Sequence, residues 1–215
     1  MTSSATQQAF GPEFCRQLDL LLAKRRDVRR FHTTQVDEEL LQNCLSSFSK
    51  APSVGLSEPW RIIRVQSETA RTAALDNFEA ANKKALSGYS GDKSKIYANL
   101  KLSGMREAPV QIAVFCDDGT DKGAGLGAET MPEMRRYSCV SAIMQFWLVL
   151  RAHGLGLGWV SILDPEQLTR DLDVPEDWSL VAYLCIGWPE DYGDTPELEK
   201  VGWELRHQEL PVEVR

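Results

Sequence analysis

The feature that most constrains this sequence is a long apolar segment, residues 134–153, which reads MRRYSCVSAIMQFWLVLRAH. In a helix, its second half would present apolar side chains on nearly every face. Such a helix is stable only where other parts of a protein cover it, in a core or in a dimer interface. Gly154, Gly156 and Gly158 follow and are expected to break the helix. The rest of the chain is therefore expected to fold around this segment.

Apolar spacing predicts three further helices and four strands. Helical periodicity covers residues 14–24, 38–48 and 67–88, and Asp37 is placed to cap the second of these helices. Apolar and β-branched runs predict strands at residues 61–66, 110–117, 158–162 and 179–188. This order lacks strict alternation of strands and helices, which favours an α+β fold over a doubly wound sheet. The 215 residues fit one domain, expected over residues 14–215 after a flexible N-terminus of residues 1–13.

Composition excludes several classes of protein. A formal net charge of −7 and a pI near 5.1 argue against nucleic-acid binding, which draws on a basic surface. The five cysteines are widely spaced and form no C-x-x-C pair, which is typical of a reducing compartment. None of the three histidines stands at ligand spacing from a cysteine, so no metal site is expected. The N-terminus does not read as a secretory signal and no apolar run is long enough to span a bilayer, so a cytoplasmic location is expected.

The segment RRDVRRF, residues 25–31, places one carboxylate, Asp27, among four arginines. One interpretation is a solvated helix end, where cations also suit the helix dipole. The other is a clamp for phosphate, because planar guanidiniums grip phosphate oxygens in pairs. In an extended segment Arg25, Asp27 and Arg29 would share one face, which would place the acid beside the anion that the arginines bind.

Two further segments offer polar side chains in unusual backbone surroundings. APSVGLSEPW, residues 51–60, offers Ser53 and a close backbone approach at Gly55, although an ordinary turn between a helix and a strand would look the same. GLGLGWVSILDP, residues 154–165, places Ser161 in or at the end of a strand. A serine in a strand is usually a small polar filler, and no G-x-S-x-G elbow supports a hydrolytic role. Residues 118–127 have no apolar period and are expected to form a mobile loop, either solvated or acting as an active-site lid.

Taken together, RRDVRRF, APSVGLSEPWR, LKLSGMREAPVQIAVFCD and GLGLGWVSILDP resemble the corresponding segments of the nitroreductase-like flavoproteins. More narrowly, they resemble the 5,6-dimethylbenzimidazole synthase branch of that family, over about residues 25–206. Asp27 stands where the wider family commonly has a small hydroxyl residue, and Val54 to Leu56 stand where it commonly has a polar asparagine. Both departures favour the synthase branch. The resemblance implies a mostly antiparallel central sheet flanked by helices, in an interlocked homodimer with a C-terminal extension.

The resemblance also implies a site for FMN at the dimer interface, to which both subunits contribute. The segment from Arg25 to Arg29 would hold the phosphate and the ribityl chain, Ser53 and Leu102 would line the flavin, and Ser161 would lie near its N5 edge. Arg206 would add a C-terminal basic residue on the phosphate. The residues implied to bind FMN are Arg25, Arg26, Asp27, Val28, Arg29, Ser53, Leu102, Ser161 and Arg206.

The reaction implied by the resemblance is the oxygen-dependent fragmentation of reduced FMN to 5,6-dimethylbenzimidazole, the lower ligand of cobalamin, and erythrose 4-phosphate. FMN is then a substrate together with dioxygen, and a separate NAD(P)H-dependent flavin reductase supplies its reduced form. Asp27 would take or relay protons near the ribityl chain, and Ser161 would be the second catalytic residue.

Two other functions stay open at this point. An NAD(P)H-dependent nitroreductase or dehalogenase of the same fold would recycle its FMN and reduce a second substrate, and the arginines alone do not exclude it. A non-enzymatic flavin-binding protein would hold FMN that survives reduction and reoxidation unchanged. Asp27 and the apolar Val54 loop favour the synthase over the nitroreductase.

Overall fold

The computed structural model describes residues 10–215, so most of the expected flexible N-terminus lies outside the described part. Helix α1 (Pro12–Lys24) begins just before the predicted start of the domain. No helix among residues 10–215 is both long and apolar enough to cross a membrane.

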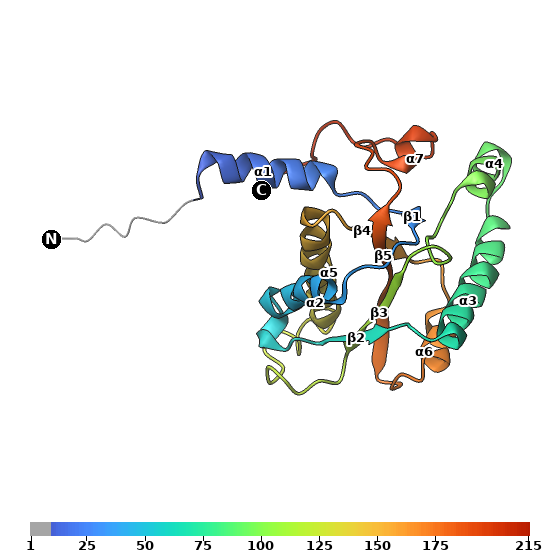
Figure 1. Ribbon diagram of the computed structural model, residues 1–215. Helices are drawn as coiled ribbons and strands as arrows, with labels where there is room; N and C mark the ends of the chain where they lie inside the picture. The colour runs from blue at the N-terminus through green and yellow to red at the C-terminus, as the bar shows by residue number, and fades with distance from the viewer. Residues whose placement is uncertain (1–9) are drawn as a thin grey trace.

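A five-stranded sheet forms the centre of the molecule (Figure 1). Its strands are β1 (Phe31–His32), β2 (Trp60–Arg64), β3 (Val110–Asp117), β4 (Gly156–Val160) and β5 (Trp178–Pro189). The order is β1-β5-β3-β2, and β4 also pairs with β5. Every one of these strand pairs is antiparallel. The predicted α+β fold with a mostly antiparallel sheet is therefore confirmed.

Helices cover both faces of the sheet, because successive side chains of its central strands point to opposite sides. Helices α2 (Glu38–Leu45) and α5 (Met134–Ala152) pack on the face that carries Ile112 and Leu184. Helices α3 (Glu68–Leu86) and α6 (Pro165–Asp171) pack on the face that carries Phe115 and Tyr183. The sheet therefore separates two apolar cores.

The apolar segment of residues 134–153 forms helix α5, which is the main helix of the core on the Ile112 and Leu184 face of the sheet. Its most deeply buried side chains, each 0% exposed, are Cys139, Ala142, Ile143, Phe146 and Leu150. Gly154, with φ +80°, ends the helix in the left-handed region that favours glycine. The prediction of a central buried helix is confirmed.

Helix α1 projects from the side of this body, as Figure 1 shows. None of its residues is buried, and Phe14, Leu18 and Leu22 are all at least 40% exposed. The helix itself was predicted, but its apolar side chains are largely uncovered within one chain.

Several local expectations need correction. Helix α2 ends at Leu45 and continues as a 3-10 turn over Ser46–Lys50, although Asp37 caps its start as predicted, with Oδ1 accepting from Leu40 N at 2.9 Å. The sequence patterns did not predict β1, α4 (Gly91–Asn99), α6 or α7 (Glu197–Lys200).

The strand predicted at residues 158–162 lies two residues earlier, so two of the glycines expected to break α5 belong to β4. The reason is a close approach of the chain at Val28. A Cβ added at Gly156 would lie 2.8 Å from Val28 Cγ2, and one added at Gly158 would overlap the Val28 carbonyl oxygen. Glycine in β4 therefore makes room for residues 27 and 28 beside the strand.

A Gly158→Ala substitution tests this close approach. We expect it to destabilise the fold by about 1–3 kcal/mol, because the new methyl group must push Val28 away from β4. Thermal unfolding measures the effect, and Gly119→Ala is the matched control, since a Cβ there would meet only ordinary contacts at 3.6 Å or more. Equal melting temperatures for the two variants would contradict the packing described here.

Candidate functional site

The segment of residues 25–30 leaves helix α1 in an extended conformation and lies beside strand β4. Arg25 caps α1 with φ −73° and ψ 120°. Val28 N–H donates to Leu157 O at 3.0 Å, and Asp27 forms a parallel bridge with Leu157. The arginine cluster is therefore attached to the sheet and does not lie on a free helix end, which argues against the solvated interpretation.

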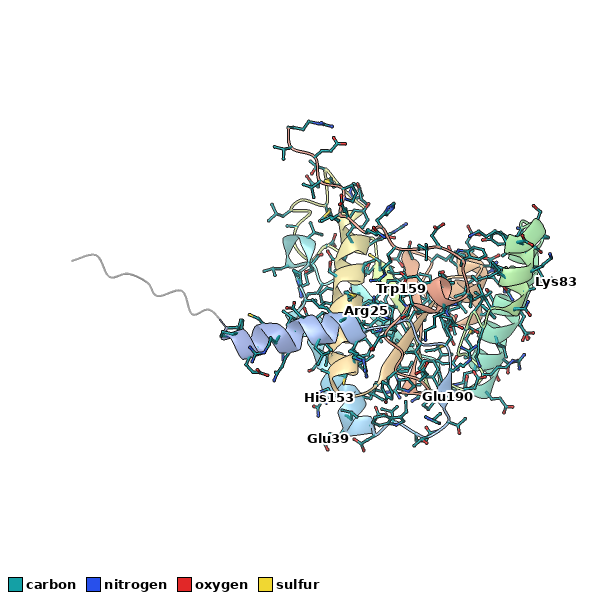
Figure 2. The ribbon with its side chains drawn as sticks, turned by 90° about the horizontal axis from the view of Figure 1, so that it is seen from above. Arg25, Glu39, Lys83, His153, Trp159 and Glu190 are labelled. Atoms are coloured by element: carbon teal, nitrogen blue, oxygen red, sulfur yellow. The ribbon has the colours of Figure 1, made fainter. Side chains whose placement is uncertain are left out.

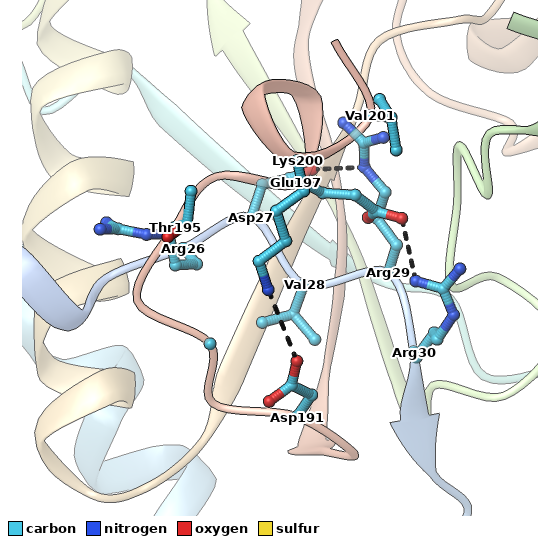
Figure 3. A pocket seen from close by; sticks show the side chains of 11 residues that line it. Arg26, Asp27, Val28, Arg29, Arg30, Asp191, Thr195, Glu197, Lys200 and Val201 are labelled. Carbon is cyan, nitrogen blue, oxygen red and sulfur yellow. Dashed lines mark hydrogen bonds and ion pairs between the residues drawn. The ribbon is translucent and has the colours of Figure 1, made fainter. Parts of the chain in front are cut away.

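Asp27 joins two parts of this site through its two carboxylate oxygens. Oδ1 accepts a hydrogen bond from Trp159 N–H on β4 at 2.9 Å. Oδ2 accepts from Arg29 Nε at 2.9 Å, a pair that is marked in Figure 3. The Asp27 side chain keeps 34% of its surface exposed, against 15% for Arg29. The carboxylate is thus fixed in place and still reachable from one side.

The chain beyond β5 folds back over the cluster and binds several of its cations. Arg26 Nε donates to Asp194 O at 2.9 Å, and Lys24 pairs with the Asp194 carboxylate. The hydrogen bond from Lys24 holds the pKa of Asp194 below its usual value. Arg30 Nη1 pairs with Glu197 Oε1 at 3.0 Å, as marked in Figure 3. This segment, residues 191–206, is called the tail below.

Trp203 anchors the far end of the tail. Its ring lies 5.3 Å from the ring of Tyr89 and 6.2 Å from that of Tyr97, and Lys93 Nζ lies 4.5 Å above it. Trp203 thus packs on the body of the protein, against α4 and the residues just before it. The tail is therefore held at Asp194 and at Trp203, and Arg206 lies three residues after the second of these anchors.

Two guanidiniums of the cluster remain available to a ligand. Within the described residues Arg25 makes no side-chain hydrogen bond or ion pair, and it lies over the ring of Trp147 at 4.6 Å. Burial lowers the pKa of Arg25, and the positive charges of Arg26 and Arg206 lower it further. Arg206 has only a loose ion pair with Glu199, Nε to Oε1 3.5 Å. Figure 2 labels Arg25 close to Trp159 in the centre of the molecule.

A cavity of about 170 Å³ lies between these two arginines. Four arginines line it, Arg25, Arg26, Arg29 and Arg206, together with Asp27 and the tail residues 196–198. Four guanidiniums and the two carboxylates of Asp27 and Glu197 leave the cavity with an excess of positive charge, which suits a doubly charged anion such as a phosphate monoester. The cavity is smaller than the roughly 300–1,000 Å³ that enclose a drug-sized ligand, so it fits a phosphate group and not a whole nucleotide.

Leu102 and Ser161 lie beside the same cluster. Arg29 Nη1 donates to Lys101 O at 3.3 Å, which places the half-buried Leu102 next to it. Ser161 follows the last residue of β4, two positions after the residue whose N–H binds Asp27, and it is exposed. The structure thus brings the predicted residues 25–29, 102, 161 and 206 into one region.

Ser53 lies elsewhere in the chain. Its Oγ accepts from Glu58 N–H at 3.1 Å, and the next residue, Val54, donates to Ser138 Oγ in the second turn of α5 at 3.0 Å. Arg25 contacts the ring of Trp147, which is nine residues after Ser138 on α5. Nine residues correspond to roughly 13 Å along the helix axis. The loop of residues 118–127 packs on this distant end too, where Gly123 lies directly against Gly55. One chain therefore does not bring Ser53 to the arginine cluster.

Sequence reasoning missed the aromatic support of the site and most of its tail contacts. Trp147 lies inside the uniformly apolar segment and has no distinguishing local pattern. The pairing of Asp194 and Glu197 with the arginines depends on contacts across more than 160 residues. Among residues 10–215 no group of three or more His, Cys, Asp or Glu side chains could hold a metal ion.

Comparisons with known proteins agree with this geometry. A model of the nitroreductase family matches residues 22–188. The chain is 51% identical over 201 residues to the 5,6-dimethylbenzimidazole synthase of Rhodospirillum rubrum, covering 94% of this chain and 95% of the relative. It is 45% identical over 193 residues to that of Rhodobacter capsulatus, covering 90% and 92%.

Solved structures share the fold. Oxidized iodotyrosine deiodinase bound to FMN and 3-iodo-L-tyrosine superposes with a TM-score of 0.70 at 23% identity, covering 92% of this chain and 97% of that one. The resemblance noted from the sequence is thus confirmed. The chain belongs to the nitroreductase family and, within it, to the group of the 5,6-dimethylbenzimidazole synthases.

Proposed function

We propose that this protein is a 5,6-dimethylbenzimidazole synthase, which converts reduced FMN and dioxygen to 5,6-dimethylbenzimidazole and erythrose 4-phosphate. The observation that carries this proposal is the pair of available guanidiniums, Arg25 and Arg206, next to the fixed carboxylate of Asp27. A substrate with a phosphate at one end fits this arrangement. The high identity to two synthases favours this reaction over the recycling of FMN by a nitroreductase.

The arginines of the cluster divide into two groups in this proposal. Arg25 and Arg206 bind the phosphate, because their guanidiniums have no strong partner of their own. Arg26 holds the tail and Arg29 holds Asp27, so both act on the substrate mainly through other residues. The ribityl chain then extends from the phosphate past Asp27 and Val28.

Asp27 and Ser161 are the proposed catalytic residues, since both are aligned along β4. Ser161 lies two residues beyond Trp159, which corresponds to roughly 7 Å along a strand. Reduced FMN supplies the electrons that dioxygen takes up, and the flavin breaks down in the process. Asp27 takes or relays protons near the ribityl chain. The exposed Ser161 hydroxyl donates a hydrogen bond to the flavin ring near N5.

The protein acts as a homodimer in this proposal, and the second copy supplies Ser53. Within one chain Ser53 lies far from Arg25, while α1 and the outer face of α5 expose apolar side chains that include Phe14, Tyr137 and Val140. A second copy would cover these faces and bring its own Ser53 loop to the flavin. A separate NAD(P)H-dependent flavin reductase supplies reduced FMN, and the reaction takes place in the cytoplasm.

The reaction is tested by binding chemically reduced FMN under anaerobic conditions, admitting oxygen and analysing the extract by liquid chromatography and mass spectrometry. We expect 5,6-dimethylbenzimidazole and erythrose 4-phosphate in proportion to the flavin lost. Intact FMN with hydrogen peroxide, together with rapid flavin reduction by NAD(P)H, would replace the proposal by a nitroreductase. Intact FMN without either activity would indicate a flavin-binding protein.

Substitution of the two catalytic residues separates chemistry from binding. Asp27→Asn should lower product formation at least about a hundredfold, because the amide takes up no proton at neutral pH. Ser161→Gly should lower it about tenfold to a hundredfold through the lost hydrogen bond. FMN binding, measured by fluorescence quenching, should change little in both variants.

Arg29→Gln is the control for Asp27, since it also breaks the Asp27–Arg29 ion pair but keeps the carboxylate. Arg29→Gln should retain most of the product formation. If it lost as much product as Asp27→Asn, the role of Asp27 would be to fix Arg29 and not to move protons.

A mixture of two inactive variants tests the shared site. Arg25→Ala and Ser53→Phe chains, refolded together, should form mixed dimers in which one site has both changes and the other has neither. Random pairing should restore roughly a quarter of the wild-type activity. No recovery, in a mixture that sedimentation shows to be dimeric, would place Arg25 and Ser53 in the same subunit's site.

A further inference from the structure

We infer that Trp147 is a positioning residue, which holds the guanidinium of Arg25 in the orientation that receives the phosphate of the flavin. This inference rests on the proposed function and assigns a role to a side chain that does not touch the substrate. It begins from the lack of any other support for Arg25. Because Arg25 pairs with no carboxylate or carbonyl among the described residues, its only close side-chain contact of defined geometry is the ring of Trp147, 4.6 Å away.

The ring of Trp147 is itself held firmly in place. The residue lies on α5 between the fully buried Phe146 and Leu150, and only 7% of it is exposed. The ring of Trp159 packs against it with centroids 6.5 Å apart and an interplanar angle of 47°. A side chain enclosed in this way presents one fixed face, and a guanidinium stacked on that face loses most of its freedom to turn.

Trp159 also connects this support to Asp27, the proposed proton-transfer residue. Trp159 packs on Trp147 with its side chain and donates its backbone N–H to Asp27 Oδ1. Arg25 and Asp27 are therefore positioned from one rigid support. The distance between the phosphate and the proton-transfer group is in this way set by the core of the protein and not by flexible side chains.

Charge explains why such a support is needed. Arg25 lies near Arg26 and Arg206, whose like charges repel its guanidinium when no anion lies between them. Glu197 lines the same cavity and offers an alternative partner. The electron-rich face of an indole ring attracts a cation without neutralising it, so Arg25 remains charged and unpaired. An acid at position 147 would hold Arg25 as well, but it would compete with the phosphate.

A double-mutant cycle tests the inference by FMN binding, measured in the wild type, Trp147→Leu, Arg25→Gln and the double variant. Trp147→Leu should weaken binding about tenfold, because the cation–π contact is lost. Arg25→Gln should weaken it about tenfold to a hundredfold. In the Arg25→Gln background the Trp147→Leu substitution should then have little further effect, because Trp147 acts through Arg25.

A purely structural role for Trp147 would give the opposite pattern, with the same weakening in both backgrounds. Trp178→Leu is the matched control, since the guanidinium of Arg61 lies over the Trp178 ring at 5.6 Å and neither residue lines the cavity between Arg25 and Arg206. It should leave FMN binding unchanged. If Trp147→Leu does not fold, Trp147→Phe replaces it, with a smaller loss of about threefold that should also vanish with Arg25→Gln.

The cycle also separates the inference from the proposed function. If the wild type binds no FMN, the proposed function fails. If it binds FMN and Arg25→Gln has no effect, the phosphate lies elsewhere and the inference is overturned with that assignment. If Arg25→Gln weakens binding and the effects of the two substitutions are additive, the proposed function stands and the inference alone is wrong.

Discussion

The contact between residues 27–28 and strand β4 is the interaction on which the rest of the site depends. It fixes an otherwise irregular segment to the central sheet through Val28 N–H and the Asp27 carboxylate. Without it the arginines would follow α1 away from the core. Because of this contact, residues 25–30 lie between β4 and the tail. The glycines of β4 are the sequence requirement for this contact, because any larger residue would fill the space that Val28 occupies.

Because of this contact, Asp27 has a structural role in addition to its proposed catalytic role. The carboxylate accepts hydrogen bonds from a backbone N–H and an arginine, which is a structural role, and it also lines the cavity proposed to bind an anion. Asp27 therefore neutralises part of the arginine cluster and also lies next to the ligand that the cluster is proposed to bind. Asp27 forms its ion pair with Arg29, and neither Arg25 nor Arg206 forms a hydrogen bond or an ion pair with it.

Local sequence patterns predicted the parts of the fold that have strong periodicity or clear caps. Residues 110–117 form β3 with the expected bounds, Asp37 caps α2, and the apolar segment is the buried helix α5. Helix α4 was missed because GDKSKIYAN has few apolar residues and forms little of the core. The site was predicted mainly through the resemblance to a family, which named Arg206 as a partner of the cluster. The tryptophan support and the tail pairings could not be predicted, because they arise from packing between distant segments and leave no local pattern.

The use of Arg25 and Arg206 as the proposed phosphate-binding pair has a consequence for the rate of product release. In the proposed reaction the phosphate stays with the sugar fragment, so the guanidiniums that capture the starting material also grip one of the two products. The tail beside this site is anchored by contacts of Asp194 with Lys24 and Arg26 and by the aromatic side chains around Trp203, and none of these residues is among the proposed catalytic groups. The benzimidazole fragment, which bears no charge that the clamp can bind, is free to leave first. Release of the sugar phosphate would then be slower than release of the benzimidazole, and its rate would depend on how firmly the tail is held against the arginine cluster.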